Sequence, residues 1–365
     1  MLIIGQVPPP HHGQAVMIKQ LLDAPMPGIE RNHVDLSYSR ALEETGQFKL
    51  RKVCRLASVI LKTLWALARR RPDVVYYPPA GPMWVPVVRD IVTLLAIRPF
   101  SRRMVFHFHG VGLSALWLEG IRSRVLRFLF RRAYFGADLA IMLAPSVPDD
   151  GKVLRARRRA YVPNGIPDAA AGYVTALERR RPGPLRILFV GAVTEPKGVF
   201  VLTEAASRLW YAGFNFRLQL MGSCEPTVRR AIEERAGPHS DRLDFLDVLV
   251  GSKKWRTYAS TDVFSLPTHY EAEGLPLVCL EAMAFGVPVV ATRWRGIPDM
   301  VTHEETGLLV RPEDPEDLSR ALRRLLSDDS LRHDMGERGR RRYEAEFTLE
   351  RWTDTMRDEV LRVAS

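Results

Sequence analysis

Residues 273–292 read EGLPLVCLEAMAFGVPVVAT, and this stretch decides both the fold class and the expected site. Glu273 and Glu281 are separated by seven residues, and Pro276 suits the first turn of a helix. A helix over 276–285 is otherwise almost wholly apolar, so Glu281 is expected to be a buried carboxylate. An ionised carboxylate is costly there unless it accepts strong hydrogen bonds. A ribose diol offers two suitable donors, and the start of the same helix offers free N–H groups to a phosphate or sugar hydroxyl.

A purely structural interpretation of the two glutamates stays open at this point. Glu281 then belongs to a buried ion pair, and Glu273 is a favourable acid at the start of a helix. The spacing alone does not choose between the two interpretations.

Short apolar runs alternate with longer helical segments along the whole chain, which predicts an α/β fold with parallel sheets and crossover helices. In the first half, helices are expected near 14–23, 50–71 and 118–134, and one is expected over 198–211 in the second. The predicted buried strands are MLIIG (1–5), DVVYYP (73–78), RMVFHFHG (103–110), DLAIML (138–143), RILFVG (186–191), FRLQLMG (216–222), VFSLP (263–267), PVVAT (288–292) and GLLV (307–310).

Two domains are expected, because 365 residues exceed the roughly 250–300 that one hydrophobic core supports. A polar stretch over 165–185 separates them, so we predict Rossmann-like domains over 1–170 and 171–345. Ligands of such sheets bind at the carboxyl ends of the strands, and a cleft between two facing domains is the expected active site.

Composition excludes several classes of protein. Hydrophobic residues make up 46% and charged residues 26%, so collagen, a disordered acidic tail and a disulfide scaffold are excluded. Cys54, Cys224 and Cys279 show neither a C-x-x-C pair nor a metal-binding spacing, which favours the reducing cytosol. No signal peptide is expected, and the best apolar run, 58–68, contains a lysine and is too short to span a membrane.

Charge is unevenly distributed between the two halves. Residues 1–170 contain 25 basic and 12 acidic side chains, a net charge of +13, and the remainder carries −2. The basic half is expected to attract anions, such as nucleic acid, an anionic membrane or a phosphate-bearing substrate.

The segment 273–292 resembles the donor-site signature of the retaining glycosyltransferases of family 4, which have the B-type fold of two facing Rossmann-like domains. In that family the second glutamate holds the nucleotide ribose and the first lies beside the donor sugar. The resemblance therefore assigns these roles to Glu281 and Glu273, with Gly274 and Leu275 beside the donor at the helix start. It also implies that a C-terminal helix, here over 346–365, returns to the first domain.

A second motif, FVGAVTEPKGV (189–199), agrees in order and spacing. Lys197 begins a helix, where a lysine is unfavourable unless an anion lies beside it. The resemblance places the donor diphosphate against Lys197 and makes Gly191 a donor contact. Ala192 stands where the family usually has arginine, so either another basic residue covers the phosphates or the leaving group is less stabilised. A solvated surface lysine is the structural alternative.

The first half matches the family through short motifs only. In HFHGVG (107–112), His107 and His109 face the same side of a strand. The resemblance makes His109 a contact of the donor sugar and leaves His107 a structural role. It also implies that Gly13, in the first loop, and Gly296, in RGIPDMV, approach the donor.

The implied reaction moves a hexosyl group from a UDP- or GDP-linked donor to a hydroxyl, with retention at the anomeric carbon. The resemblance favours attack on the face that the diphosphate leaves, with that diphosphate accepting the proton. No D-x-D stretch occurs, so neither a metal nor a tightly bound cofactor is expected. Two alternatives stay open, a nucleotide-sugar epimerase or hydrolase of the same fold and a basic nucleic-acid-binding protein.

Two basic, apolar segments, 48–71 and 121–135, suit helices that lie on an anionic membrane. The acceptor is then a lipid-linked saccharide in bacterial polysaccharide or glycolipid assembly, and the protein is cytoplasmic, peripheral on the inner face of the cell membrane. Helices that pack on the sheet with a solvated basic face are the alternative. Nucleic acid is not an expected partner, because no nucleic-acid motif appears.

Overall fold

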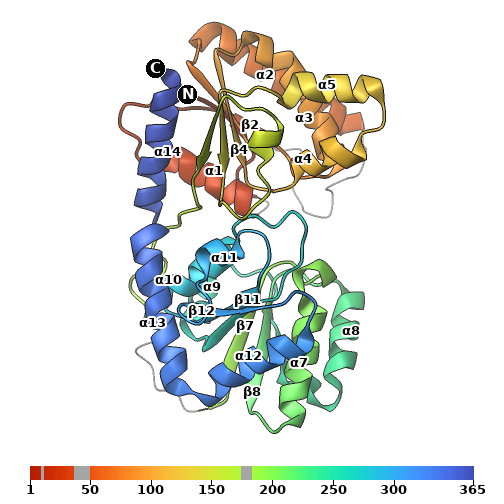
Figure 1. Ribbon diagram of the computed structural model, residues 1–365, viewed down its shortest axis with the longest axis vertical. Coiled ribbons are helices and arrows are strands. Elements are labelled where there is room, and N and C mark those ends of the chain that lie inside the picture. Colours follow the sequence, from red (N-terminus) through yellow and green to blue (C-terminus); the bar gives the residue numbers. More distant parts are fainter. Residues whose placement is uncertain (10–11, 37–49, 174–182) are drawn as a thin grey trace. The chain divides into compact units, whose positions relative to one another are not determined.

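The structure is a computed structural model, and it describes residues 1–9, 12–36, 50–173 and 183–365. The chain divides into two compact units, residues 1–164 with 349–365 and residues 165–348 (Figure 1). The sequence analysis placed these divisions at 170 and 345. The predicted loop 5–15, basic segment 48–71 and linker 165–185 lie partly outside the described residues.

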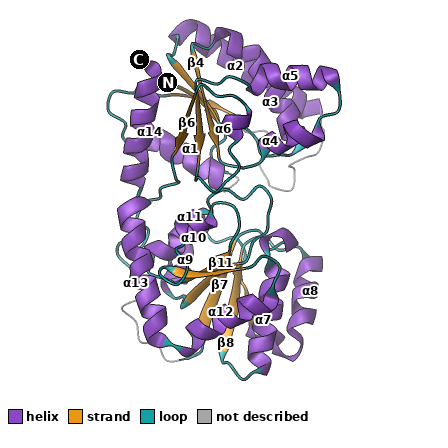
Figure 2. Cartoon of the chain, in the orientation of Figure 1, coloured by secondary structure: helices purple, strands orange, loops and turns teal. Residues whose placement is uncertain are grey.

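The first unit is built on a six-stranded parallel sheet with the strand order β2-β1-β3-β4-β5-β6 (Figure 2). From β1 the chain adds β2 on one side of the sheet, and then adds β3 and the later strands on the other side. Open α/β sheets bind their ligands at such a switch point, which here lies between β1 and β3. The strands are β1 (Leu2–Gly5), β2 (Asn32–Asp35), β3 (Val74–Tyr77), β4 (Arg103–Phe108), β5 (Leu139–Met142) and β6 (Arg158–Tyr161).

Helices cover this sheet. α2 (Leu50–Arg70), α3 (Trp84–Ile97) and α5 (Arg124–Tyr134) pack side by side, while α14 (Leu349–Ala364) packs against β3 and β4 (Figure 1). The remaining helical segments are α1 (Gly13–Asp23), η2 (Arg98–Phe100), α4 (Leu113–Ala115), η3 (Leu116–Gly120) and α6 (Asp150–Val153).

The second unit has its own six-stranded parallel sheet, with the order β12-β11-β10-β7-β8-β9. Counted along the chain this is the doubly wound order 3-2-1-4-5-6, and its switch point lies between β7 and β10. The strands are β7 (Leu185–Val190), β8 (Phe216–Met221), β9 (Leu243–Phe245), β10 (Val263–Leu266), β11 (Val289–Thr292) and β12 (Gly307–Val310).

Helices pack around this second sheet in two groups. α7 (Val199–Tyr211) packs against α8 (Pro226–Ala236) and α12 (Pro315–Ser327), whereas α10 (Leu277–Ala284) packs against α13 (Asp329–Glu346). Shorter segments complete the unit: η5 (Glu195–Lys197), η6 (Gly237–Arg242), α9 (Gly251–Ala259) and α11 (Ile297–Met300).

The two predicted Rossmann-like sheets are confirmed, and the strands that were not predicted lie at their edges. The sequence analysis missed β2, β6 and β9, which are all edge strands with partly exposed side chains. No continuous apolar run marks such strands. It also missed α3, and the helix expected over 118–134 is divided, because η3 ends at Gly120 and α5 begins at Arg124. The cleft between facing domains stays a prediction.

Gly198 holds the two loops of the second switch point together. It lies between η5 and α7 with φ +78, in the left-handed region that favours glycine. A Cβ on Gly198 would lie 2.0 Å from the carbonyl oxygen of Pro267, the residue that follows β10. The loop after β7 therefore approaches the loop after β10 so closely that only glycine fits at position 198.

Gly198→Ala is expected to lower the free energy of unfolding of the second unit by at least about 2 kcal/mol, since it combines a left-handed backbone with a backbone clash. Urea denaturation measures this change. Gly213→Ala is the matched control, because Gly213 has φ +88 and open space around its Cβ position. We expect it to cost only about 1 kcal/mol. Equal losses in the two variants would contradict a close approach at Gly198.

Candidate active site

At the second switch point, Lys197 and Glu273 form an ion pair. Lys197 comes from η5, after β7, and Glu273 comes from the loop between β10 and α10. Lys197 Nζ donates to Glu273 Oε2 at 2.6 Å, and Thr268 Oγ1 donates to the same oxygen at 3.0 Å. The ammonium also lies 4.9 Å from the centroid of the Tyr270 ring. Glu273 is only 7% exposed, so this carboxylate is buried as well as paired.

Glu281, on α10, is held in the same manner by α9. Lys254 Nζ donates to Oε1 at 2.5 Å, and the Tyr258 hydroxyl donates to Oε2 at 2.7 Å. Burial, reinforced by the Glu281 charge, raises the pKa of Tyr258 well above its ordinary value, so the phenol keeps the proton that it donates. Glu281 is likewise 7% exposed.

The Cys279 thiol is close enough to Glu273, Lys197 and Glu281 to be affected by their charges. Burial raises the pKa of Cys279 well above its ordinary value; Glu273 and Glu281 raise it further, and Lys197 opposes the shift. The thiol therefore stays protonated. Each carboxylate thus accepts hydrogen bonds from one lysine and one hydroxyl.

These contacts bear on the two interpretations of Glu281. The structural interpretation requires a cation beside Glu281, and Lys254 is that cation. A carboxylate oxygen can nevertheless accept more than one hydrogen bond. Oε1 and Oε2 each receive one donor from the described residues, so both oxygens keep capacity for a ligand. Sequence reasoning missed Lys254 and Tyr258. The signal that could have found them was the need of a buried carboxylate for a cation and a donor.

Four backbone positions predicted near the donor lie in loops of this unit beside its strands and helices. Gly274 and Leu275 precede α10, whose start has no side-chain cap. Gly296 begins α11 after β11, and this loop is tied to the Glu273 loop because Trp294 Nε1 donates to the Tyr270 carbonyl at 2.8 Å. Gly191 follows β7, and its carbonyl oxygen lies 1.8 Å from where a Cβ of Gly222 would be.

His109 and Gly13 belong to the first unit. His109 follows β4, and Tyr76, on β3, places its hydroxyl 2.8 Å from His107 Nδ1 and 3.3 Å from His109 Nε2. The two imidazole rings lie 4.0 Å apart. Gly13 begins α1 directly after His12, whose Nδ1 accepts the Ala15 N–H at 3.3 Å.

Both buried histidines are neutral over the ordinary pH range. Burial, assisted by the nearby His12, lowers the pKa of His109 to about 3. Burial also lowers the pKa of His107 well below its ordinary value, and His109 adds to that shift. His109 can therefore serve as a neutral hydrogen-bonding group, but not as a proton acceptor near pH 7.

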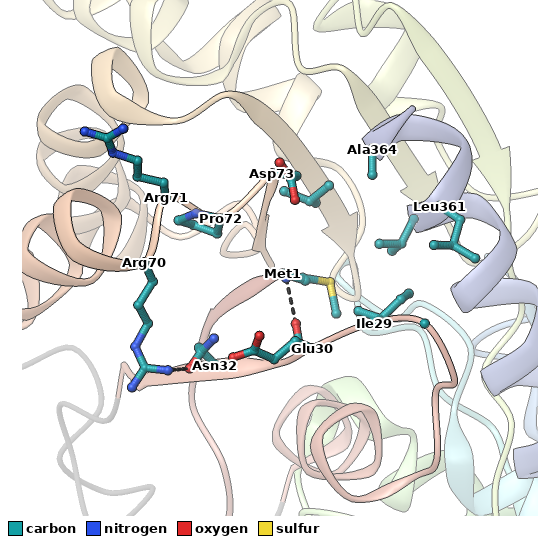
Figure 3. Close-up of a pocket in the computed structure, with 13 residues that line it drawn as sticks. Met1, Ile29, Glu30, Asn32, Arg70, Arg71, Pro72, Asp73, Leu361 and Ala364 are labelled. Atoms are coloured by element: carbon teal, nitrogen blue, oxygen red, sulfur yellow. Dashed lines mark hydrogen bonds between the residues drawn. The ribbon is translucent and has the colours of Figure 1, made fainter.

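A pocket of about 280 Å³ lies elsewhere in the first unit, where β1, β2 and β3 begin (Figure 3). Met1, Glu30, Arg70, Asp73 and Leu361 are among its lining residues. Ligands of open α/β sheets bind at the carboxyl ends of the strands, whereas this pocket lies at their amino ends. It is therefore separate from the predicted site residues.

Comparisons with solved structures define the fold. The chain superposes on sucrose-phosphate synthase from Thermosynechococcus elongatus with a TM-score of 0.73 and 22% identity, over 100% of this chain and 99% of that one. It superposes on Anabaena HepE in complex with UDP-glucose with a TM-score of 0.70 and 16% identity, over 99% of each chain. The fold is the two-domain B-type fold of glycosyltransferases.

A sequence comparison then assigns the second unit. Residues 178–342 match the family of glycosyl transferases group 1, so the second unit carries a group 1 domain. The capsular polysaccharide biosynthesis glycosyltransferase CapM of Staphylococcus aureus is 32% identical over 166 residues. That match covers 44% of this chain and only 41% of CapM. The resemblance to B-type glycosyltransferases is confirmed, and membership of family 4 stays a prediction.

Lowering the pH is expected to destabilise the first unit through His109. An unfolded histidine takes up its proton near pH 6.5 and the folded one only near 3, so protons stabilise the unfolded chain. Between pH 7 and pH 5 the wild type should lose about 2 kcal/mol more free energy of unfolding than His109→Gln. Denaturant titrations at both pH values measure this. Identical losses would contradict a neutral, buried His109.

Proposed function

We propose that the protein transfers a hexosyl group from a nucleotide-sugar donor, linked to UDP or GDP, to a hydroxyl of an acceptor saccharide. The observation that carries this proposal is the pair of buried carboxylates, Glu273 and Glu281, at the switch point of a group 1 domain. Glu281 accepts hydrogen bonds from the ribose hydroxyls, and Glu273 lies beside the donor sugar. The solved complex of HepE with UDP-glucose, a protein of the same fold, supports a donor of this class.

The proposed chemistry retains the anomeric configuration and requires no metal. The acceptor oxygen forms the new bond to the anomeric carbon while the bond from that carbon to the diphosphate oxygen breaks. The acceptor's proton passes to the departing phosphate oxygen, and Lys197 and the N–H groups at Gly274 and Leu275 stabilise its charge. A neutral His109 fits a hydrogen bond to the donor sugar, because its lowered pKa prevents it from taking this proton.

Glu281→Ala is expected to weaken nucleotide binding roughly 10- to 100-fold, because hydrogen bonds to a charged group contribute about that much affinity. Isothermal calorimetry with UDP, GDP and ADP, without added metal, measures this and identifies the base. Glu271→Ala is the matched control, because Glu271 is an exposed acid in the same segment. Equal affinity of Glu281→Ala and wild type would show that Glu281 is a structural carboxylate.

A nucleotide-sugar epimerase or hydrolase of the same fold is the second candidate reaction. It uses the same nucleotide contacts and differs in needing no acceptor. Consumption of donor at an undiminished rate without any acceptor would favour it over glycosyl transfer.

We further propose that the acceptor is lipid-linked and that the first unit lies on an anionic membrane, on the cytoplasmic face. α2 and α5 contain no acidic residue, and Asp90, the acid of α3, is fully buried. Exposed large apolar side chains gather on these helices and the segments beside them: Leu61, Trp65, Met83, Trp84, Val85, Val88, Val92, Phe100, Leu118, Val125 and Phe128. The described residues of the second unit expose Tyr211, Val248 and Val250.

The helices differ from the sequence-based expectation in one respect. Val59, Leu64 and Leu67, on one face of α2, are buried or half-buried, as the packing alternative requires. The exposed Leu61 and Trp65 lie on another face of the same helix. No helix within the described ranges is long and apolar enough to span a membrane.

Trp65→Ser combined with Phe128→Ser is expected to reduce binding to phosphatidylglycerol vesicles about tenfold or more, because two large apolar groups no longer enter the lipid. Vesicle co-sedimentation measures this, with pure phosphatidylcholine as the neutral comparison. Tyr211→Ser, on the second unit, removes an equally exposed ring and should bind as wild type does. Failure of the wild type to bind anionic vesicles, with strong RNA binding instead, would favour the nucleic-acid alternative.

A further inference from the structure

Among the described residues, the cation that the proposed function gives to the departing phosphate is Lys197, and it is already paired. The diphosphate of a nucleotide sugar carries two negative charges, and charge-assisted hydrogen bonds from arginine or lysine are the strong contacts to phosphate in proteins. Lys197 is already bonded to Glu273 at 2.6 Å. Ala192, where the resemblance to family 4 implies an arginine, is an exposed alanine after β7. A second cation must come from elsewhere in the second unit if the diphosphate is to be neutralised there.

Lys254 is the cation that the structure places beside the expected ribose position. Its Nζ lies 2.5 Å from Glu281 Oε1 and 4.7 Å from the centroid of the Trp255 ring. Its side chain is 20% exposed, so the ammonium reaches the surface of the site and is not sealed in the core. Glu281 is the carboxylate that the proposed function gives to the ribose, and the diphosphate is attached to that same ribose.

We propose that Lys254 binds the donor diphosphate and leaves Glu281 when the ribose hydroxyls take its place; this inference rests on the proposed function. The exchange conserves hydrogen bonds, because ribose hydroxyls donate to Oε1 where the ammonium donated before. Tyr258 keeps its bond to Oε2 at 2.7 Å, so Glu281 stays oriented throughout. Lysine suits such an exchange, because its compact charge sits on a flexible four-carbon stem with three donors.

The competing explanation is that Lys254 only orients Glu281. In that case the lysine acts through the carboxylate, and its loss weakens every ligand that carries the ribose. If Lys254 binds the diphosphate, its loss weakens only ligands that carry phosphate. Uridine and UDP share the base and ribose and differ in the diphosphate, so their affinities separate the two roles.

The experiment measures UDP and uridine affinities for the wild type, Lys254→Met and Lys253→Met, or GDP and guanosine affinities if the wild type selects GDP. Calorimetry serves for the diphosphate and ligand-observed NMR for the nucleoside. We expect Lys254→Met to lose roughly 10- to 100-fold in UDP affinity while uridine affinity changes less than threefold. Lys253→Met removes the same charge from an exposed neighbouring position on α9 and should leave both affinities unchanged.

A second variant tests whether a cation at position 192 can replace Lys254. Ala192→Arg added to Lys254→Met should restore UDP affinity toward the wild-type value and leave uridine affinity unchanged. Melting temperatures of all variants confirm that each is folded before binding is compared.

Three results would overturn the proposal. Equal losses of UDP and uridine affinity in Lys254→Met would make Lys254 a positioning residue, and unchanged UDP affinity would make it a structural one. If the wild type binds none of UDP, GDP or ADP, the proposed function itself fails, and this inference fails with it. The first two results leave the proposed function intact, so the two failures are distinguishable.

Discussion

The second unit depends on one electrostatic constraint, which is that a buried carboxylate must be stabilised by a cation or by hydrogen-bond donors. Glu273 and Glu281 each meet it with one lysine and one hydroxyl. An unmatched charge at either position would cost several kcal/mol, comparable to the whole stability of a domain. The doubly wound sheet makes the Lys197–Glu273 contact possible, because it brings the ends of β7 and β10 next to each other.

A buried ion pair is weak evidence for stability, because apolar residues of similar size often serve as well. Two such pairs at the switch point of one sheet agree with the proposed binding of a ligand there. There, charged groups held in place before the ligand arrives lower the cost of organising the site. The close approach at Gly198 has the same consequence, because it fixes the Lys197 loop against the segment that leads to Glu273.

Sequence reasoning reached the parts of the fold that buried apolar runs define. It predicted the central strands and the burial of Glu281, because these follow from unbroken hydrophobic stretches and a single charge within one. It did not predict β2, β6 or β9, whose side chains are partly exposed. It also missed Lys254 and Tyr258, because α9 is a polar helix whose partner is chosen by tertiary packing and not by spacing along the chain. The assigned roles of the site residues remain predictions.

The two units differ in the surface that they offer. The first unit contains the basic segments and the exposed apolar side chains on α2, α3 and α5. The second contains the two paired carboxylates and the group 1 domain. This division agrees with a donor site in one unit and contacts to an anionic, partly apolar partner in the other.

A crystal structure of the protein soaked with UDP tests the central claim most directly. The account predicts ribose hydroxyls within hydrogen-bond distance of Glu281 and the diphosphate beside Lys197, at the carboxyl ends of β7 and β10. A nucleotide bound away from both carboxylates, with the Lys254 to Glu281 contact unchanged, would contradict it.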